Sequence, residues 1–276
     1  MPPLQALVAE GHDVALVVSR ADKRRGRGGA LQPSPVKAAA LDLGLPVTER
    51  VEDVVDAAAE LGVVVAFGRL IKPPVLAALP MVNVHFSLLP RWRGAAPVER
   101  AILAGDTETG VCLMALEETL DTGPVFRREV VPIDPEETAD ELRDRMVVVG
   151  TRLVVDALRD GLGDPESQVG EPTYAAKVEP EERELHWDQP AAVLHRVVRV
   201  GDAWTTFRGK RLKVRRARVA PTSPAPLGPG EMDGGLVGTG DGALELVEVQ
   251  PEGRGPQPVS AWRNGARPQP GERLGS

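Results

Sequence analysis

The sequence predicts an α/β protein, in which a doubly wound, Rossmann-like domain is followed by a small OB-like β-barrel domain. Short apolar runs alternate with helical patterns over residues 1–160, which is typical of a parallel sheet covered by helices. Residues 161–185 are rich in Gly, Pro and acidic side chains and are expected to form a linker. Residues 186–276 contain short strand-like runs broken by Gly and Pro, the pattern of a small barrel.

The first part of the doubly wound domain is predicted to alternate helices and strands. Gly11 ends the first helical pattern, and Ser34-Pro35 provides an N-cap and a first-turn proline for the second. The predicted helices cover residues 4–10, 34–43, 51–61 and 76–79, and the predicted strands cover 14–18, 46–47, 63–67 and 82–86. The strands over 14–18 and 63–67 are continuous apolar runs, so we expect them to be buried. A basic, flexible loop is expected over residues 23–29.

The second part contains longer elements. Apolar side chains at positions 142, 146, 149 and 153 predict one amphipathic helix over residues 136–158. The other elements predicted before the linker are a helix over 98–104 and strands over 110–116 and 125–131. Beyond the linker we expect a helix over 191–200, strands over 204–207, 212–219, 236–239 and 243–249, and a Pro-rich loop over 221–230.

The order of elements is unusual at its start. A doubly wound domain normally begins with a strand and its ligand-binding loop. Here the first predicted element is the helix that would follow them. A sheet that lacks this central strand would leave the strands beside it with unpaired edges.

The composition excludes several classes of protein. The chain has 276 residues, 42% of them apolar and 26% charged, so it can bury a core. Its net charge of −7 argues against a generic nucleic-acid binder, although net charge does not exclude a local basic patch. Cys112 is the single cysteine, no apolar run reaches the ~20 residues of a membrane span, and the N-terminus lacks a signal-peptide pattern. We therefore expect a cytoplasmic protein.

The segment 83–97 carries the strongest chemical signal. Asn83 and His85 lie two residues apart on a predicted strand, so their side chains point the same way. An amide and an imidazole at one site can donate to a carbonyl oxygen and move a proton, which suits acyl transfer to or from an amine. Asp121 lies in a tight turn between two predicted strands. A strand-end amide, a buried histidine and a turn former are the purely structural interpretations of these residues.

These segments resemble a known family. Residues 83–97, 105–110 and 120–123 closely resemble the methionyl-tRNA formyltransferases, a branch of the folate-dependent formyltransferases. The resemblance covers nearly the whole chain and includes residues 26–28, 32–37, 174–177 and 246–253. The Asn-x-His and Ser-Leu-Leu-Pro sequences are shared by the folate-dependent enzymes, whereas Arg-Trp-Arg-Gly-Ala-Ala-Pro and the C-terminal domain point to the tRNA branch. The opening strand and Gly-Thr-Pro turn of the family have no match here.

The resemblance implies a reaction and the residues that perform it. The formyl group of 10-formyltetrahydrofolate would pass to the amino group of methionyl-initiator tRNA without a metal. Asn83 and His85 would stabilise the oxygen of the tetrahedral intermediate, His85 would also move the proton, and Asp121 would orient His85. The folate site would be lined by a turn of the motif, Ser87, Leu88, Leu89 and Pro90. We expect a monomer that binds folate and tRNA and does not associate with membranes.

Two basic clusters are candidates for tRNA contact. The resemblance assigns the acceptor end of the tRNA to the first cluster, which consists of Lys23, Arg24, Arg25 and Arg27. Seven Lys or Arg side chains lie between residues 208 and 218. Lys213 and Arg215, and with them Arg211, would share one strand face that follows a phosphate backbone, and the predicted tRNA contacts of this cluster are Lys213, Arg215 and Arg216. The alternative for both clusters is a solvated, charged surface.

Three other functions remain open. The chain could formylate a small amine, such as an amino sugar or a purine precursor, or it could hydrolyse formyl-folate and release formate. The basic C-terminal barrel argues against both, because a small substrate gives it no role. A third possibility, if the missing strand reflects a true truncation, is an inactive remnant that still binds tRNA.

Overall fold

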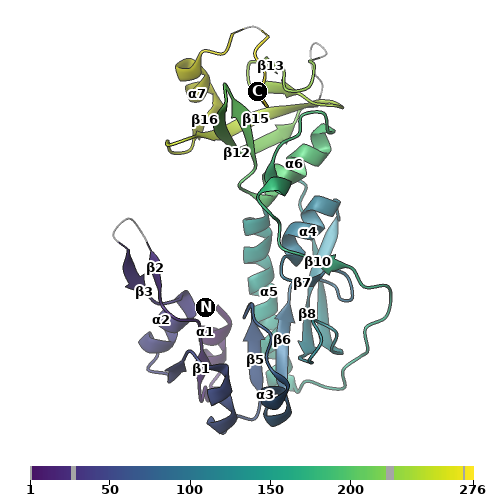
Figure 1. The fold of residues 1–276 in the computed structure, drawn as a ribbon. Helices are drawn as coiled ribbons and strands as arrows, with labels where there is room; N and C mark the ends of the chain where they lie inside the picture. Colours follow the sequence, from purple (N-terminus) through teal and green to yellow (C-terminus); the bar gives the residue numbers. More distant parts are fainter. Residues whose placement is uncertain (1, 26–28, 222–226, 270) are drawn as a thin grey trace. The chain divides into compact units, whose positions relative to one another are not determined.

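The computed structural model describes residues 2–25, 29–221, 227–269 and 271–276. The chain divides into two compact units (Figure 1). Unit 1 comprises Met1–Pro97, Glu108–Pro132 and Arg143–Ala175, and unit 2 comprises Val98–Thr107, Ile133–Leu142 and Ala176–Ser276. Unit 1 has the α/β architecture and unit 2 the small antiparallel β architecture that the sequence predicts, so the fold class is confirmed.

Unit 1 alternates short helices and strands. Its helices are α1 (Pro2–Ala9), α2 (Pro35–Asp42), the 3-10 helix η1 (Val51–Asp56) and α3 (Pro73–Ala78). Its strands are β1 (Val17–Val18), β2 (Lys23–Arg25), β3 (Ala30–Gln32), β4 (Val47–Thr48), β5 (Gly62–Val65), β6 (Met81–His85), β7 (Arg93–Gly94), β8 (Glu108–Ala115), β9 (Val125–Pro132) and β10 (Tyr174–Ala175). Two further helices, α4 (Pro97–Ala104) and α5 (Ala139–Asp160), contain residues of both units.

The main sheet of unit 1 has the strand order β5-β6-β8-β9. β5 runs parallel to β6 with Val64 opposite Asn83, whereas β6 is antiparallel to β8 with His85 opposite Cys112. β1 and β4 form a separate parallel pair. Among the described residues β5 therefore has a sheet partner on one side only, and the expectation of an unpaired edge is confirmed for this strand.

The elements near this edge are shorter or more exposed than predicted. The strand expected over 63–67 is Gly62–Val65, its residues are half-buried, and within the described parts of the chain only its edge toward β6 is paired. The strand expected over 14–18 pairs only at Val17–Val18, and the helix expected over 51–61 is only the 3-10 helix η1. An apolar run does not distinguish an edge strand from a central one, so the predicted burial was wrong here.

The basic loop predicted over residues 23–29 is wrong at Lys23–Arg25, which form a strand. β2 and β3 form an antiparallel hairpin in which Lys23 lies opposite Gln32. Residues 26–28 lie outside the described residues. Backbone groups make the pairing, so a run of charged side chains does not reveal it. The neighbouring prediction for α2 is confirmed, since the Ser34 Oγ accepts a hydrogen bond from the Lys37 N–H at 3.1 Å.

Helix α5 packs against the strand that carries the motif (Figure 1). Met146 and Leu153 on its apolar side are buried, as the sequence predicts. Gly150 allows a close approach, because a Cβ at this position would lie 2.7 Å from Val84 Cγ1 on β6. The helix thus fixes the sheet directly beneath Asn83 and His85.

Unit 2 is built around one antiparallel sheet with the order β11-β12-β15-β14-β13, and β16 pairs with β15. The strands are β11 (Trp204–Phe207), β12 (Lys210–Val219), β13 (Met232–Asp233), β14 (Leu236–Gly238), β15 (Ala243–Pro251) and β16 (Gln257–Pro258). The helices are the 3-10 helix η2 (Glu181–Arg183), α6 (Ala191–Val200) and α7 (Val259–Ala266). The bounds of α6 and β11 agree with the predicted ones, whereas α7 was not predicted.

The core of unit 2 lies between this sheet and its helices. Leu194 of α6 and Leu212, Leu244 and Leu246 of the sheet are almost fully buried. The rings of Phe207 and Trp262 meet edge to face, with centroids 5.2 Å apart. Unit 2 therefore has a hydrophobic core of its own.

Candidate active site

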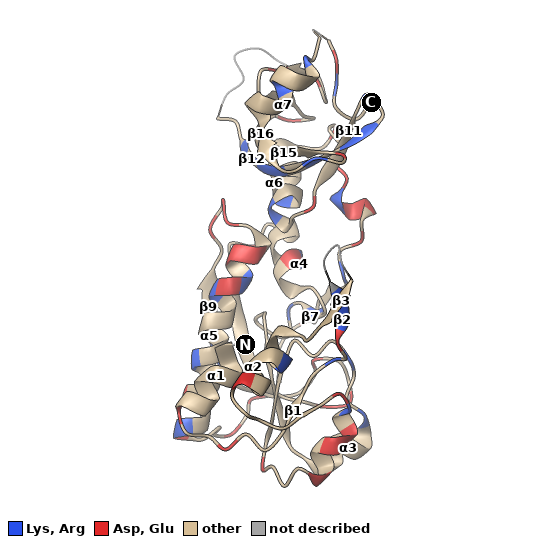
Figure 2. Ribbon diagram, turned by 90° about the vertical axis from the view of Figure 1, so that its left-hand side faces the viewer, with Lys and Arg blue, Asp and Glu red and all other residues tan. Residues whose placement is uncertain are grey.

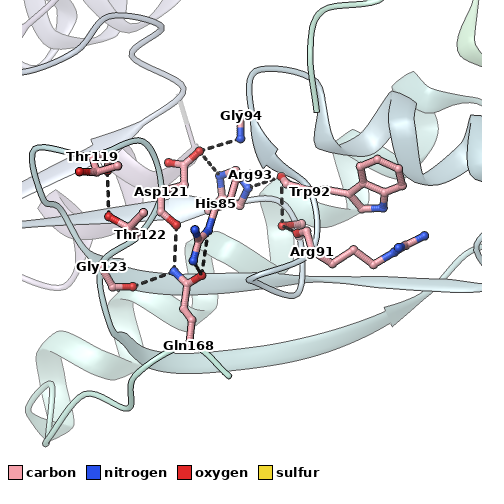
Figure 3. Close-up of polar contacts among 11 residues, drawn as sticks. His85, Arg91, Trp92, Arg93, Gly94, Thr119, Asp121, Thr122, Gly123 and Gln168 are labelled. Atoms are coloured by element: carbon pink, nitrogen blue, oxygen red, sulfur yellow. Dashed lines mark hydrogen bonds and ion pairs between the residues drawn. The ribbon is translucent and has the colours of Figure 1, made fainter. Parts of the chain in front are cut away.

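His85 ends strand β6 and is held between two acceptors (Figure 3). Its Nε2 lies 3.0 Å from the carbonyl oxygen of Trp92, and its Nδ1 lies 3.7 Å from Asp121 Oδ2. Asn83 precedes it by two residues on the same strand, so the side chains of Asn83 and His85 project from the same face of the sheet. Asn83 is half-buried and His85 is buried. The predicted proximity of His85 and Asp121 is present.

The surroundings of His85 fix its protonation. Burial lowers the pKa of the imidazole below its ordinary value, against the smaller opposing effects of the Asp121 charge and the Trp92 carbonyl. The ring is therefore neutral at pH 7. Because the Trp92 carbonyl can only accept, the single proton lies on Nε2. Nδ1 is left unprotonated and faces Asp121 at a distance too long for a hydrogen bond.

The turn between β8 and β9 places Asp121. Its φ of +52° lies in the left-handed region, which residues other than glycine rarely adopt. Its carboxylate is buried, and Oδ2 accepts a hydrogen bond from the Gly94 N–H at 2.8 Å. A Cβ at Gly123 would lie 2.0 Å from the Ala115 carbonyl oxygen, so the turn requires glycine there. The sequence Asp-Thr-Gly is thus a structural requirement as well as a candidate site.

The turn formed by Ser87, Leu88, Leu89 and Pro90 uses two of its side chains internally. The Ser87 Oγ donates to the Arg91 carbonyl at 2.6 Å, and Leu89 is buried in a cluster with Cys112, Met114 and Val125. The Ser87 hydroxyl and the Leu89 side chain therefore stabilise the loop itself. A ligand at this turn would meet its backbone together with the partly exposed Leu88 and Pro90.

Gln168 and Arg93, which lie beside the Asp121 turn, were not singled out by sequence reasoning. The Gln168 Nε2 donates to the carbonyl oxygens of Asp121 and Gly123, at 2.9 and 2.8 Å. Its Oε1 accepts from the Arg93 Nε and Nη2, at 3.1 and 2.7 Å. Arg93 lies inside the predicted motif and Gln168 lies six residues before Tyr174, where a further family-like sequence begins. These positions were the signals available.

The segment that the sequence marks as a linker is attached to the motif over residues 166–175. β10 pairs with β7, and Glu166 forms a bridge with Val125. The Thr173 Oγ1 accepts from the Trp92 N–H at 2.9 Å. The first half of the predicted linker therefore supports the candidate site.

The first basic cluster lies on the β2–β3 hairpin. Lys23 and Arg24 are exposed, and the Arg24 Nη1 donates to the Gly29 carbonyl at 2.9 Å. Arg27 and the side chain of Arg25 lie outside the described residues.

The second basic cluster lies on β12, which Figure 2 shows with Lys and Arg along much of its length. Lys213 and Arg215 both pair with Asp202, at 2.8 and 3.3 Å. A register shift around Arg216 interrupts the alternation of the strand, so Arg215 and Arg216 are both exposed. Arg216 lies 3.8 Å from Glu141. The sequence predicts the cluster but not its acidic partners.

A polar pocket of about 230 Å³ adjoins this cluster within unit 2, between α6, β12 and residues 136–138. Arg199 in its wall is buried and donates to the carbonyl oxygens of Glu137 and Asp134, at 2.7 and 2.8 Å. The His195 Nε2 lies 3.7 Å from Glu136 Oε2, and burial lowers the pKa of this imidazole. The Arg199 guanidinium is therefore engaged by backbone acceptors of its own unit.

No group of three or more His, Cys, Asp or Glu side chains in the described part of the chain is arranged to hold a metal ion. None of the helices formed by the described residues is long and apolar enough to cross a bilayer.

Both halves of the chain match family models. Residues 3–158 match the model described as formyl transferase, and residues 177–267 match the model of the formyl transferase C-terminal domain. Two curated relatives are both named methionyl-tRNA formyltransferase. The protein of Roseobacter denitrificans is 42% identical, covering 96% of this chain and 92% of its own length. That of Jannaschia sp. is 43% identical, covering 98% and 95%.

Solved structures share the fold. WlaRD, described as a sugar 3N-formyl transferase in the presence of dTDP and 5-N-formyl-THF, matches with a TM-score of 0.69 and 16% identity over 92% of this chain and 94% of its own. A methionyl-tRNA formyltransferase from Clostridium thermocellum matches with a TM-score of 0.56 and 20% identity over 68% of this chain and 88% of its own. At these identities the two structures support the architecture alone.

Proposed function

This chain belongs to the formyl transferase family, and we propose that it transfers the formyl group of 10-formyltetrahydrofolate to the amino group of methionyl-initiator tRNA. The proposal rests on the match of both halves of the chain, because relatives named methionyl-tRNA formyltransferase align with nearly its whole length. A likeness confined to residues 3–158 would fit any enzyme that takes formyl from folate. The product, N-formylmethionyl-tRNA, serves translation initiation.

The reaction joins the amine nitrogen to the formyl carbon and breaks the bond from that carbon to folate N10. The amine loses a proton and N10 gains one, so the step needs a proton carrier. Negative charge develops on the formyl oxygen, and fixed donors stabilise such charge by about 3 kcal/mol each. We assign Asn83 to this oxygen, joined by His85 once its Nδ1 carries the proton taken from the amine, because the two side chains share one face of β6.

His85 is suited to carry the proton. Its lowered pKa keeps the ring neutral at pH 7, so it can accept a proton from the attacking amine. The Nε2 proton is already committed to the Trp92 carbonyl, which leaves Nδ1 as the accepting nitrogen. The imidazolium that forms is stabilised by Asp121, 3.7 Å away, until the proton passes to N10. No metal is needed for these steps.

The folate would lie against the turn of residues 87–90, where Leu88 and Pro90 are partly exposed. The tRNA would contact two basic clusters, Lys23, Arg24, Arg25 and Arg27 on the hairpin, and Lys213, Arg215 and Arg216 on β12. We propose domain boundaries at 1–160, 161–185 and 186–276. The first family model ends at residue 158, whereas the second begins at residue 177, inside the proposed linker. The protein acts as a cytoplasmic monomer.

A second candidate is a formyltransferase for an amino sugar, because the model that matches residues 3–158 is described only as formyl transferase and does not name the acceptor. Purified chain incubated with labelled 10-formyltetrahydrofolate distinguishes the candidates when methionyl-initiator tRNA, an amino-sugar nucleotide or no acceptor is supplied. We expect label on the tRNA and none with His85→Ala. Label on the sugar, formate released without an acceptor, or tRNA binding without transfer would each replace the proposal.

A further inference from the structure

Gln168 connects an otherwise exposed segment to the turn that carries Asp121 (Figure 3). Every other described residue from 163 to 171 is exposed, whereas Gln168 is half-buried. Its amide group makes four hydrogen bonds, two donated to the turn and two accepted from Arg93. Four is the full capacity of a side-chain amide with two N–H donors and two lone pairs.

The two donated bonds support a turn in which Asp121 has an unfavourable backbone conformation. They hold the carbonyl oxygens of Asp121 and Gly123, on both sides of Thr122, while Asp121 itself has φ +52°. Such a conformation persists only when surrounding contacts impose it. On the carboxylate side, the Gly94 N–H holds Asp121 Oδ2. Gln168 therefore fixes the backbone of the residue whose carboxylate faces His85.

Arg93 fixes Gln168 in turn. Its guanidinium meets the Gln168 Oε1 through two nitrogens, which also determines that Nε2 points at the turn. The backbone of Arg93 and Gly94 pairs with β10, so the strand that supplies the Gly94 N–H to Asp121 also carries the residue that orients Gln168. Backbone and side-chain support for Asp121 thus converge from one strand.

We propose that Gln168, oriented by Arg93, is a positioning residue that holds the Asp121 turn so that its carboxylate faces His85 Nδ1. The inference rests on the proposed function for its kinetic consequence. Attachment of the segment does not depend on Gln168, because the Glu166–Val125 bridge, Thr173 and β10 already make it. Loss of Gln168 is therefore expected to act on Asp121 and not on the fold.

The first test is a titration of the uncomplexed protein. The chain has four histidines, so the His85 imidazole can be assigned by NMR with His85→Gln. Asp121 is the charged group that faces His85, and Cys112 lies opposite it on β8 with a thiol whose pKa burial raises. Because the Asp121 charge raises the pKa of His85, Gln168→Ala should lower that pKa by about half a unit or more.

The matched control is Glu166→Gln, on the same segment, which removes an exposed carboxylate 3.4 Å from Arg128 and no contact with the turn. It should leave the His85 titration unchanged. Gln168→Glu is the second variant, because a carboxylate keeps the size but cannot donate to the two carbonyls. An unchanged His85 pKa in both Gln168 variants overturns the proposal. The His85 titration needs no substrate, so its result tests the positioning role of Gln168 independently of the proposed reaction.

The second test is a double-mutant cycle on formyl transfer. Gln168→Ala alone should lower kcat by about 10- to 100-fold with KM for the tRNA unchanged, as for other groups that orient a reacting side chain. In an Asp121→Asn background, Gln168→Ala should lower kcat by less than about twofold, because the carboxylate that Gln168 positions is already absent. Equal losses in both backgrounds would show that Gln168 acts elsewhere and would overturn the assignment.

Discussion

The Asp121 turn of unit 1 and strand β12 of unit 2 are both polar clusters, and they differ in how their charges are held. In the turn, the buried Asp121 is fixed by Gly94 and Gln168, and it faces one imidazole. On β12 the basic side chains are exposed or partly exposed, and Lys213 and Arg215 share Asp202 as a partner. Exposed ion pairs are weak, so the strand can exchange its partners for a ligand whereas the turn cannot.

The comparison teaches that one cluster is organised for geometry and the other for charge. A single substitution in the turn should abolish formyl transfer, because each group there makes contacts that no other residue can replace. Substitutions on β12 should act in proportion to the charge removed. The following experiments test this difference.

The largest expected effect is that of His85→Ala on turnover. Loss of the proton carrier should lower kcat by about 10³-fold, within the range of general acid–base catalysis, and leave tRNA affinity unchanged. The measurement is single-turnover formylation alongside tRNA binding by filter retention. Near-normal turnover would show that the turn is as tolerant as β12 and would remove the distinction.

The next effect is that of neutralising Lys213, Arg215 and Arg216 together. Replacing them with Gln should weaken tRNA binding by about tenfold and reduce the slope of log K against log salt by up to about 2, since fewer counterions are released. The decrease in slope should be smaller than that expected for the loss of three phosphate contacts, because Asp202 and Glu141 already offset part of the positive charge. An unchanged slope would make β12 a solvated surface.

A third experiment compares the buried histidine of each unit. Burial lowers the pKa of both His85 and His195 from 6.5, so the unfolded chain binds more protons than the folded one as the pH falls below that value. The free energy of unfolding should therefore decrease as the pH falls from 7 to 5, by up to about 1.4 kcal/mol per pH unit for each group.

Chemical denaturation at each pH measures this loss. His195→Gln should reduce the acid-induced loss in unit 2, and His85→Gln should do the same in unit 1. His12→Gln is the control, because His12 is not among the buried polar residues. A loss of stability that is the same in all variants would assign the acid sensitivity to other groups.

The smallest expected effect is that of Asp202→Asn. Removing the shared partner frees Lys213 and Arg215 for phosphate, so tRNA should bind about 2- to 5-fold more tightly and with a steeper salt dependence. The same assay with Asp188→Asn, which removes an exposed carboxylate of unit 2, serves as control. Weaker binding would mean that Asp202 organises the strand instead of restraining it.

Local sequence patterns accounted for most of the elements and for the centre of the candidate site. The alternation of side chains along a strand placed Asn83 and His85 on one face, whereas the proximity of Asp121 to His85 was expected only from the family resemblance. The Ser34 cap located the start of α2, and the bounds of α6 agree with its apolar periodicity. These features depend on residues a few positions apart, which is the range over which periodicity and capping act.

Only the tertiary structure decided which distant groups meet. Gln168 contacts Asp121 across 47 residues, and Asp202 pairs with Lys213 through the folding of β11 onto β12. The exposure of β5 and the pairing of the β2–β3 hairpin are likewise set by neighbours that no local pattern names. A sequence states what each residue can bond to, but the partner is chosen by the topology that brings two segments within hydrogen-bond distance.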